Sequence, residues 1–183
     1  MAFLSKSGMY RLGITNFGNN VLISDKCSIY GTDISIGNNV RIDDFCILSG
    51  NIVLGNNIHI GAYSALYGKY GIIMEDYTGL SPRCIIFSAT DDFGGDYLIS
   101  PMNPPEYTNV TGGPVVLEKF VQLGANVIVM PNLTLSTGAV IGAMSFVKRD
   151  IGYFQMWAGN PLRFIRTRSN GLVHLANKLT YIK

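Results

Sequence analysis

The chain carries little charge and no excess of either sign. Only 14% of its 183 residues are Asp, Glu, Lys or Arg, and 14 basic residues balance 12 acidic ones. A net charge this close to zero provides no extended positive electrostatic potential for binding nucleic acid. Since 48% of the residues are hydrophobic and few are charged, we expect part of the surface to be buried against other copies of the chain.

The sequence also lacks long apolar runs, a cysteine framework and metal-ligand spacings. No stretch approaches the ~20 apolar residues that a membrane span needs, and the apolar part of the start is too short for a signal peptide. The three cysteines are an odd count, and Cys27 and Cys46 fall at inward repeat positions, so we expect small core residues. These features predict a cytoplasmic protein with a single domain over residues 1–183 and no metal site.

Aliphatic residues recur every six positions, a spacing that neither the helix period of 3.6 nor the strand period of 2 explains. The two series are Ile36, Ile42, Leu48, Leu54, Ile60, Leu66 and Ile72, then Leu117, Leu123, Val129, Leu135, Ile141 and Val147. In a hexapeptide repeat, six residues form one short strand and a corner, and three such sides close one coil of a parallel β-helix. The aliphatic residues are then expected to stack in its core, with Gly and Asn at the corners.

The repeat is interrupted in the middle of the chain. After Ile72 we predict a slip of one residue, to Ile73, Gly79 and Ile85, and from about residue 90 to 114 the pattern disappears. Loops this long within a compact array are usually functional. This one contains tyrosine and asparagine side chains of the kind that line sugar or base pockets.

The tail, residues 152–183, leaves the repeat. From Leu172 to Ile182 the spacing predicts a short helix that covers the open end of the coil, where strand edges are otherwise unpaired. Its expected apolar face consists of Leu172, Leu175, Ala176 and Leu179.

Two segments carry a resemblance to a known family. Residues 141–151 (IGAMSFVKRDI) and residues 157–161 (WAGNP) are similar to the terminal coil and exit turn of hexapeptide-repeat acyltransferases, in particular the small sugar acetyltransferases. Together with the repeat and the loop, the resemblance covers nearly the whole chain. It implies an all-β solenoid: a left-handed parallel β-helix with a long inserted loop and a short C-terminal helix.

The resemblance also implies a homotrimer in which acyl-CoA, most simply acetyl-CoA as co-substrate, lies between neighbouring subunits. The pantetheine amides are then expected to meet backbone at two corners that bear only small residues. These are Gly124, Ala125, Gly142 and Ala143. Four basic residues are candidates for the CoA phosphates, namely Lys148, Arg149, Arg163 and Arg166.

The chain departs from the family at the catalytic position. Sugar O-acetyltransferases of this type carry a histidine shortly after the strand that corresponds to residues 85–88, and here Asp92 takes that place, with Asp91 as a rival one residue away. The two histidines, His59 and His174, lie elsewhere. Glu118, where the loop rejoins the coil, is a second candidate carboxylate.

An aspartate in this position favours an amine over a hydroxyl as the acyl acceptor. Deprotonating an alcohol calls for a base such as histidine, whose pKa is about 6.5, whereas aspartate near 3.9 is a poor base for that step. A neutral amine is already nucleophilic and only needs orientation and removal of a proton after attack. Some N-acyltransferases that act on dTDP-linked 4-amino-4,6-dideoxysugars look similar in this stretch.

The sequence therefore predicts acetyl transfer from CoA to the amino group of a nucleotide-linked deoxyamino sugar by direct attack. Two alternatives remain open at this point. One is O-acetylation of a sugar hydroxyl in surface-polysaccharide biosynthesis, and the other is a non-catalytic trimeric scaffold.

Overall fold

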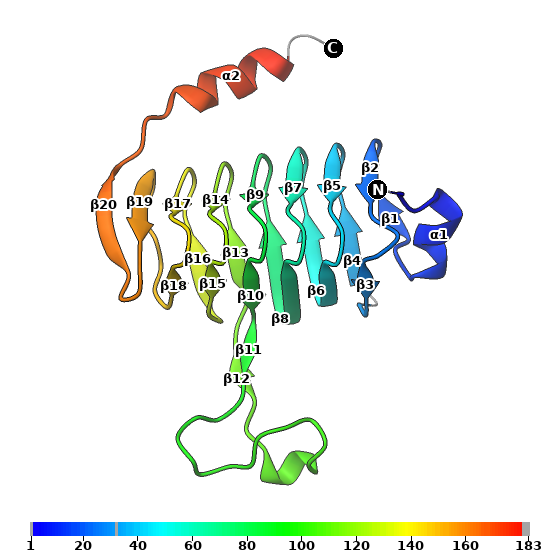
Figure 1. Ribbon diagram of the computed structural model, residues 1–183, viewed down its shortest axis with the longest axis vertical. Coiled ribbons are helices and arrows are strands. Elements are labelled where there is room, and N and C mark those ends of the chain that lie inside the picture. The colour runs from blue at the N-terminus through cyan, green and yellow to red at the C-terminus, as the bar shows by residue number, and fades with distance from the viewer. Residues whose placement is uncertain (1, 32, 181–183) are drawn as a thin grey trace.

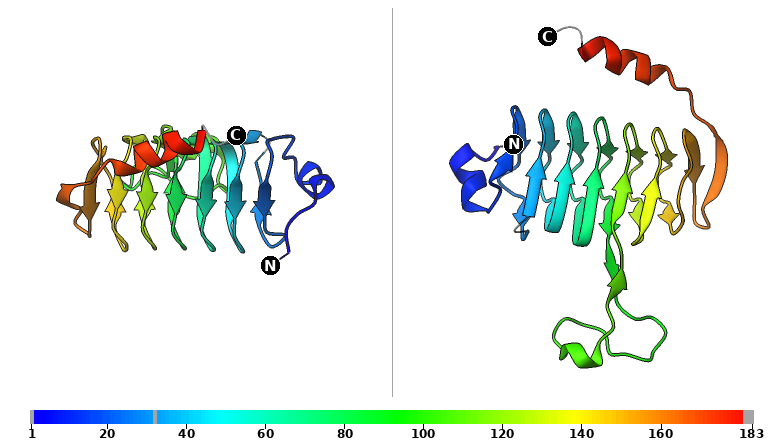
Figure 2. Two further views of the ribbon diagram at one scale, coloured as in Figure 1. Left: turned by 90° about the horizontal axis from the view of Figure 1, so that it is seen from above. Right: turned by 180° about the vertical axis from the view of Figure 1, so that it is seen from behind.

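The computed structural model describes residues 2–31 and 33–180, apart from the side chain of Thr180. It is a solenoid of parallel coils that runs from the N-terminal helix α1 to the strand β20, with a loop projecting on one side and the helix α2 on the other (Figures 1 and 2). The predicted fold class is confirmed.

Each coil contributes a strand to three faces. Face A consists of β2 (Val21–Ile23), β5 (Val40–Ile42), β7 (Ile58–Ile60), β9 (Gly79–Leu80), β14 (Gln122–Leu123), β17 (Val140–Ile141) and β19 (Gln155–Ala158). Face B consists of β3 (Ser28–Ile29), the first parts of β6 (Ile47–Leu54) and β8 (Ala65–Met74), β10 (Ile85–Phe87), β15 (Ile128–Val129) and β18 (Phe146–Val147). Face C consists of β1 (Asn16–Phe17), β4 (Asp33–Ile36), the second parts of β6 and β8, β13 (Val115–Leu117) and β16 (Leu133–Leu135).

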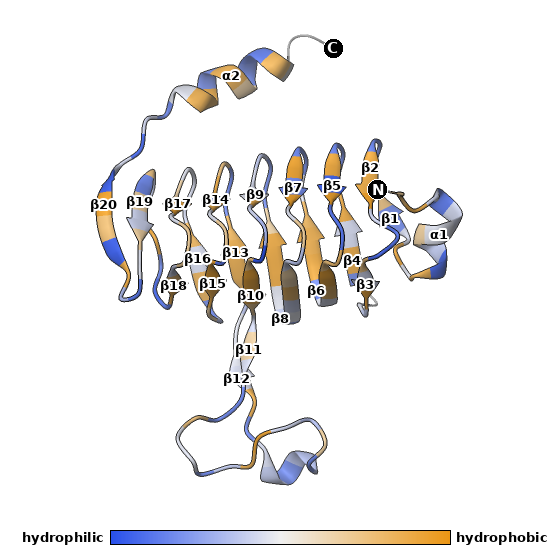
Figure 3. Ribbon diagram, in the orientation of Figure 1, coloured by the Kyte–Doolittle hydropathy of each residue, from blue (hydrophilic) through white to orange (hydrophobic). Residues whose placement is uncertain are grey.

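The six-residue series forms the core, as predicted. Every member of both series is at most 2% exposed, and Figure 3 shows hydrophobic residues concentrated on the strands, with more polar corners between them. The parallel pairing Leu48↔Leu66, repeated as Leu66↔Ile86, stacks one core residue directly on the next. Cys46 is fully buried and Cys27 packs against this core, and both are free thiols, as expected.

The predicted one-residue slip after Ile72 is wrong, because the chain slips by two. Met74, not Ile73, continues the core at 0% exposure, whereas Ile73 is 38% exposed. The cause is a bulge in β8: Gly68 pairs with Gly50 and Ile72 with Ile52, so β8 holds three residues where β6 holds one. Ile72 and Met74, two apart on one strand, therefore both point inward, and Leu80 follows six later.

Asparagine and glycine at the corners have different physical roles. Asn39 and Asn57 adopt positive φ angles of 56° and 58°, which asparagine tolerates better than most residues. Their side chains also form a ladder in which Asn39 Nδ2 donates to Asn57 Oδ1 at 3.2 Å. Gly37 is required for space, because a Cβ there would collide with the carbonyl oxygen of Gly55 in the next coil.

The two ends of the solenoid are closed by different elements. Helix α1 (Lys6–Arg11), capped by Ser5, lies at the N-terminal end. At the other end β20 (Arg163–Thr167) pairs antiparallel with β19, so this strand covers the edge of face A. The prediction that the tail helix would do so is wrong.

Helix α2 (Gly171–Thr180) runs back alongside the coils instead (Figure 2). Its predicted apolar face is confirmed, since all four of its residues line a cavity of about 270 Å³ that they share with Tyr77 and Phe120. Arg168 holds the linker to this helix by donating to the carbonyl oxygens of Phe120 (2.9 Å) and Gly138 (3.1 Å). Positions 181 and 182, the predicted end of the helix, lie outside the described residues. No helix within the described part of the chain has the length and apolarity to cross a membrane.

The loop leaves the solenoid at the corner between faces B and C. Its stem is a short antiparallel pair, β11 (Ala89–Thr90) with β12 (Thr111–Gly112), and its tip contains a 3₁₀ turn, η1 (Pro105–Tyr107). Residues 91–110 thus project away from the coils (Figure 1).

Candidate active site

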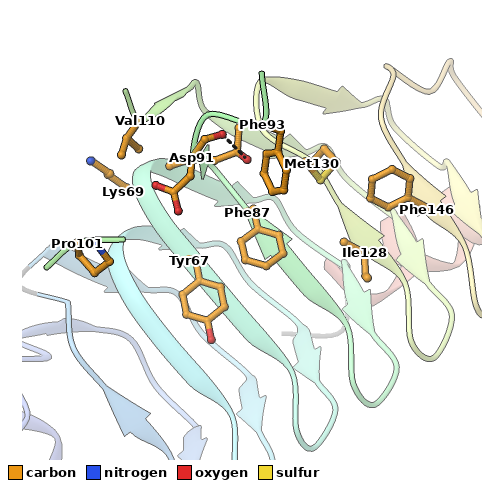
Figure 4. A pocket seen from close by; sticks show the side chains of 12 residues that line it. Tyr67, Lys69, Phe87, Asp91, Phe93, Pro101, Val110, Ile128, Met130 and Phe146 are labelled. Atoms are coloured by element: carbon orange, nitrogen blue, oxygen red, sulfur yellow. Dashed lines mark hydrogen bonds between the residues drawn. The ribbon is translucent and has the colours of Figure 1, made fainter. Parts of the chain in front are cut away.

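A pocket with a volume of about 720 Å³ lies where the loop leaves face B. Its floor comes from outward-facing side chains of successive strands, and its side wall from the loop (Figure 4). The floor consists of Tyr67, Phe87, Ile128, Met130 and Phe146; the wall consists of Ala89, Thr90, Asp91, Phe93, Pro101 and Val110, with Lys69 from the bulge in β8.

Stacking of equivalent positions makes the floor flat and apolar. Tyr67 and Phe87 are one coil apart in register, and their rings lie parallel with centroids 5.3 Å apart and an interplanar angle of 10°. Offset stacking at this spacing is favourable. Apolar side chains facing outward on a strand are not needed for the core, so their presence indicates a ligand or partner on this face.

Asp91 and Asp92 have different surroundings. The Asp91 side chain lines the pocket, whereas Asp92 is not among the residues that line it. The Asp92 carboxylate accepts the backbone N–H groups of Gly94 (3.1 Å) and Gly95 (2.9 Å), and those of two further residues as far as Tyr97. These bonds lower the pKa of Asp92, the Gly94 and Gly95 amides first among them. Asp92 thus holds the beginning of the loop in place.

Glu118 lies on the opposite edge of face C from the loop. One of its carboxylate oxygens accepts the Thr137 backbone N–H (2.8 Å) and hydroxyl (2.9 Å) in the next coil. It is outside the lining of the pocket, and its hydrogen bonds join successive corners.

The two small-residue corners stack on each other at the edge between faces A and B. A Cβ on Gly124 would lie 2.5 Å from the backbone nitrogen of Ala143, so only glycine fits there. The strands that leave these corners begin with Ile128 and Phe146, which are part of the pocket floor. Gly124, Ala125, Gly142 and Ala143 therefore form a continuous narrow ridge of backbone beside the pocket.

The four basic candidates all lie in the last coil and β20. Arg149 stacks over the Trp157 ring, with its guanidinium carbon 5.2 Å from the ring centroid. Arg163 and Arg166 are exposed on β20, where they pair with Ala158 and Met156. Lys148 is exposed directly after β18. Lys148 and Arg149 thus lie at the corner after β18, in the same coil as Gly142, and Arg163 and Arg166 lie on β20, beyond that coil.

Sequence reasoning missed the pocket floor and Lys69. The signal for the floor was available: Tyr67, Phe87 and Met130 each directly follow a core aliphatic residue, and so face outward. In the sequence, the bulge that carries Lys69 appears only as a break in the six-residue repeat, and the sequence does not show how many extra residues the break contains.

A parallel β-helix with an interrupting loop and a pocket at that loop defines the hexapeptide class of transferase. Comparison with known proteins agrees with this assignment. Residues 33–68 match the bacterial transferase hexapeptide family (six repeats). The chain is 44% identical over 179 residues to the dTDP-4-amino-4,6-dideoxy-D-glucose acyltransferase of Escherichia coli, a match that covers 96% of this chain and 93% of that one. The chain belongs to the hexapeptide-repeat acyltransferases, and it is an acyl-CoA-dependent enzyme.

Solved structures give the same result. A serine-to-alanine mutant of AntD, an N-acyltransferase from Bacillus cereus, has been solved with dTDP-4-amino-4,6-dideoxyglucose and coenzyme A; it superimposes with a TM-score of 0.96 at 44% identity, over 100% of this chain and 99% of that one. A more distant relative, the putative lipopolysaccharide biosynthesis O-acetyl transferase WbbJ of Escherichia coli, is 27% identical over 75% of this chain and 70% of its own.

Proposed function

We propose that this enzyme transfers an acyl group from acyl-CoA to the 4-amino group of a dTDP-linked 4-amino-4,6-dideoxyhexose. The observation that carries the proposal is full-length similarity to AntD and to the Escherichia coli acyltransferase, combined with a pocket in which Asp91 is the one anionic side chain among the described lining residues. A carboxylate in an apolar wall suits an amine, which it can orient by a charge-assisted hydrogen bond.

We assign the amine-orienting role to Asp91 rather than to Asp92. Asp91 faces the pocket, whereas Asp92 already accepts four backbone N–H groups. The structures of AntD give independent support. In some of these structures one aspartate is substituted, and in others one serine, ten residues before that aspartate, is substituted. In the sequence of this chain, Ser81 and Asp91 are the one serine and aspartate separated by ten residues. The spacing therefore matches the substituted aspartate of AntD to Asp91.

The reaction then proceeds by direct attack in a ternary complex. The neutral amine adds to the thioester carbonyl, and the resulting ammonium of the tetrahedral intermediate passes a proton to the Asp91 carboxylate. The carbon–sulfur bond breaks and coenzyme A leaves as the thiolate, and the proton released from Asp91 to solvent balances the proton that the thiolate takes up. No cysteine or serine is among the described residues that line the pocket, so the pocket offers neither of these nucleophiles for a covalent acyl-enzyme.

The acyl-CoA, acetyl-CoA in the simplest case, is proposed to lie along the ridge of Gly124, Ala125, Gly142 and Ala143. None of those four positions carries a side chain larger than a methyl group, and the strands that follow the two corners contribute Ile128 and Phe146 to the pocket floor. Lys148, Arg149, Arg163 and Arg166 remain the candidates for the CoA phosphates.

The working enzyme is proposed to be a homotrimer in the cytoplasm, where nucleotide sugars and acyl-CoA are available. The loop supports the trimer, because Met102, which lies midway along the loop, is 89% exposed in the single chain. Large apolar side chains at the tip of a projecting loop are expected to be covered by a neighbouring protein surface.

The test is release of free thiol from acetyl-CoA with dTDP-4-amino-4,6-dideoxyglucose and, as control, with the matching 4-hydroxy sugar. Turnover of the amine alone is expected. Asp91→Asn is expected to lower kcat/KM at least about 100-fold, as loss of a general base does, whereas Asp92→Asn lowers it less than about tenfold. Turnover of the hydroxyl sugar alone would support O-acylation. No turnover with either sugar would favour the scaffold, and a larger loss in the Asp92 variant would reverse the assignment of the two aspartates.

A further inference from the structure

The bulge in β8 places a lysine in the pocket wall. Gly68 of β8 pairs with Gly50 of β6, and the next pair is Ile72 with Ile52. One residue separates the two pairs on β6, whereas Lys69, Tyr70 and Gly71 separate them on β8. Gly71 takes a φ of +101°, which only glycine adopts easily. The bulge lies at the corner between faces B and C, which is the corner where the loop leaves the next coil.

Tyr70 fastens the bulge to the loop. Its backbone N–H donates to Ser88 Oγ (2.8 Å), and its hydroxyl donates to the Val110 carbonyl oxygen (3.1 Å). Ser88 Oγ in turn donates to the Tyr67 carbonyl oxygen (3.0 Å). The residues on both sides of Lys69 are therefore fixed, and the lysine belongs to the same wall as Val110 (Figure 4).

The charge of the Lys69 side chain indicates that the bulge contributes to ligand binding. Among the described lining residues, Lys69 is the one cation and Asp91 the one anion, and the remaining lining is mostly apolar. An acceptor with an amine at one end of the sugar and a diphosphate at the other has the complementary pair of charges. A diphosphate that enters an apolar pocket loses water and is stabilised by a nearby ammonium group.

We propose that Lys69 binds a phosphate of the nucleotide-sugar acceptor and so helps to set the enzyme's requirement for a nucleotide-linked sugar. The proposal rests on the proposed function. Coenzyme A also carries phosphates, so a useful test separates the two sources of this anion.

The experiment compares Lys69→Met, which keeps the aliphatic stem, with Lys69→Arg, which keeps the charge. Lys119→Met, at an exposed corner outside the pocket, is the matched control for lost net charge. The KM of each substrate is measured in the acyl-transfer assay. Calorimetry with dTDP alone and with coenzyme A alone measures binding without turnover, so failure of this proposal can be told apart from failure of the proposed reaction.

Lys69→Met is expected to raise the KM of the nucleotide sugar and weaken dTDP binding by about 10- to 100-fold, the loss typical of a charge-assisted contact. Lys69→Arg should recover most of this loss, and neither Lys69→Met nor Lys119→Met should change coenzyme A binding more than about twofold. An effect on coenzyme A alone would assign Lys69 to the donor and overturn the proposal. Unchanged binding of both ligands in Lys69→Met would also overturn it.

Discussion

Substitutions of two neighbouring residues on β8, Leu66 and Tyr67, are expected to affect different properties, the first stability and the second substrate binding. Leu66 is fully buried between Leu48 and Ile86, whereas Tyr67 faces the pocket and is 37% exposed. Leu66→Ala removes three carbons from the core, about 2.4 kcal/mol at ~0.8 kcal/mol each. Because coils above and below are fixed by backbone hydrogen bonds, the cavity cannot collapse, which raises the expected loss to about 3–5 kcal/mol.

Tyr67→Ala is expected to lose the stacking contact with Phe87, about 0.5–1.5 kcal/mol, and little core packing. Its free energy of unfolding should fall by less than about 2 kcal/mol, while the KM of at least one substrate rises about fivefold or more. Urea unfolding at fixed protein concentration and steady-state kinetics measure both quantities. Equal destabilisation by the two substitutions, with unchanged kinetics in Tyr67→Ala, would refute the assignment of inward and outward faces.

Two further predictions concern the loop. Tyr70→Phe removes the hydroxyl that donates to the Val110 carbonyl oxygen; limited proteolysis should then cut residues 91–110 several-fold faster, with the solenoid intact, and an unchanged rate would contradict the tethering role. The pKa of Asp92 is lowered mainly by the Gly94 and Gly95 amides, so its contribution to loop order is fully present above the ordinary value of 3.8 and is lost as pH falls through the lower folded value. Amide NMR shifts of Gly94 and Gly95 should therefore titrate together with a midpoint below 3.8, and a midpoint above it would show that these bonds do not form.

The core was predictable residue by residue because a hexapeptide repeat leaves little freedom. Each strand–corner unit has a fixed length, so a six-residue series identifies the inward side chains directly. The prediction failed only where β8 gains two residues, since Ile72, Ile73 and Met74 are all apolar and the sequence does not say which of them faces inward. Pairing with β6 and β13 decides it, and that pairing is a property of the coil stack rather than of the local sequence.

The site was predictable in position but not in detail. The interrupted repeat correctly marked the loop, and the aspartate pair marked its beginning. Which aspartate faces the pocket depends on the turn that follows, where Gly94 and Gly95 offer their N–H groups to Asp92. Short polar side chains readily accept backbone N–H groups a few residues ahead, but the sequence Asp-Asp-Phe-Gly-Gly allows either aspartate to do so.

The bulge and the loop occur at the same corner of adjacent coils, and the construction of a solenoid explains why. An insertion within a strand would turn core residues outward, whereas an insertion at a corner leaves the strands before and after it in register with their neighbours. Here Leu66 still stacks on Ile86 before the insertions, and Ile72 and Met74 still pair with Val115 and Leu117 after them. Two insertions at one corner thus add Lys69, Tyr70 and Asp91 to a flat apolar face without disturbing the stack beneath. The B–C corner is therefore where differences in acceptor specificity between related enzymes should be sought first.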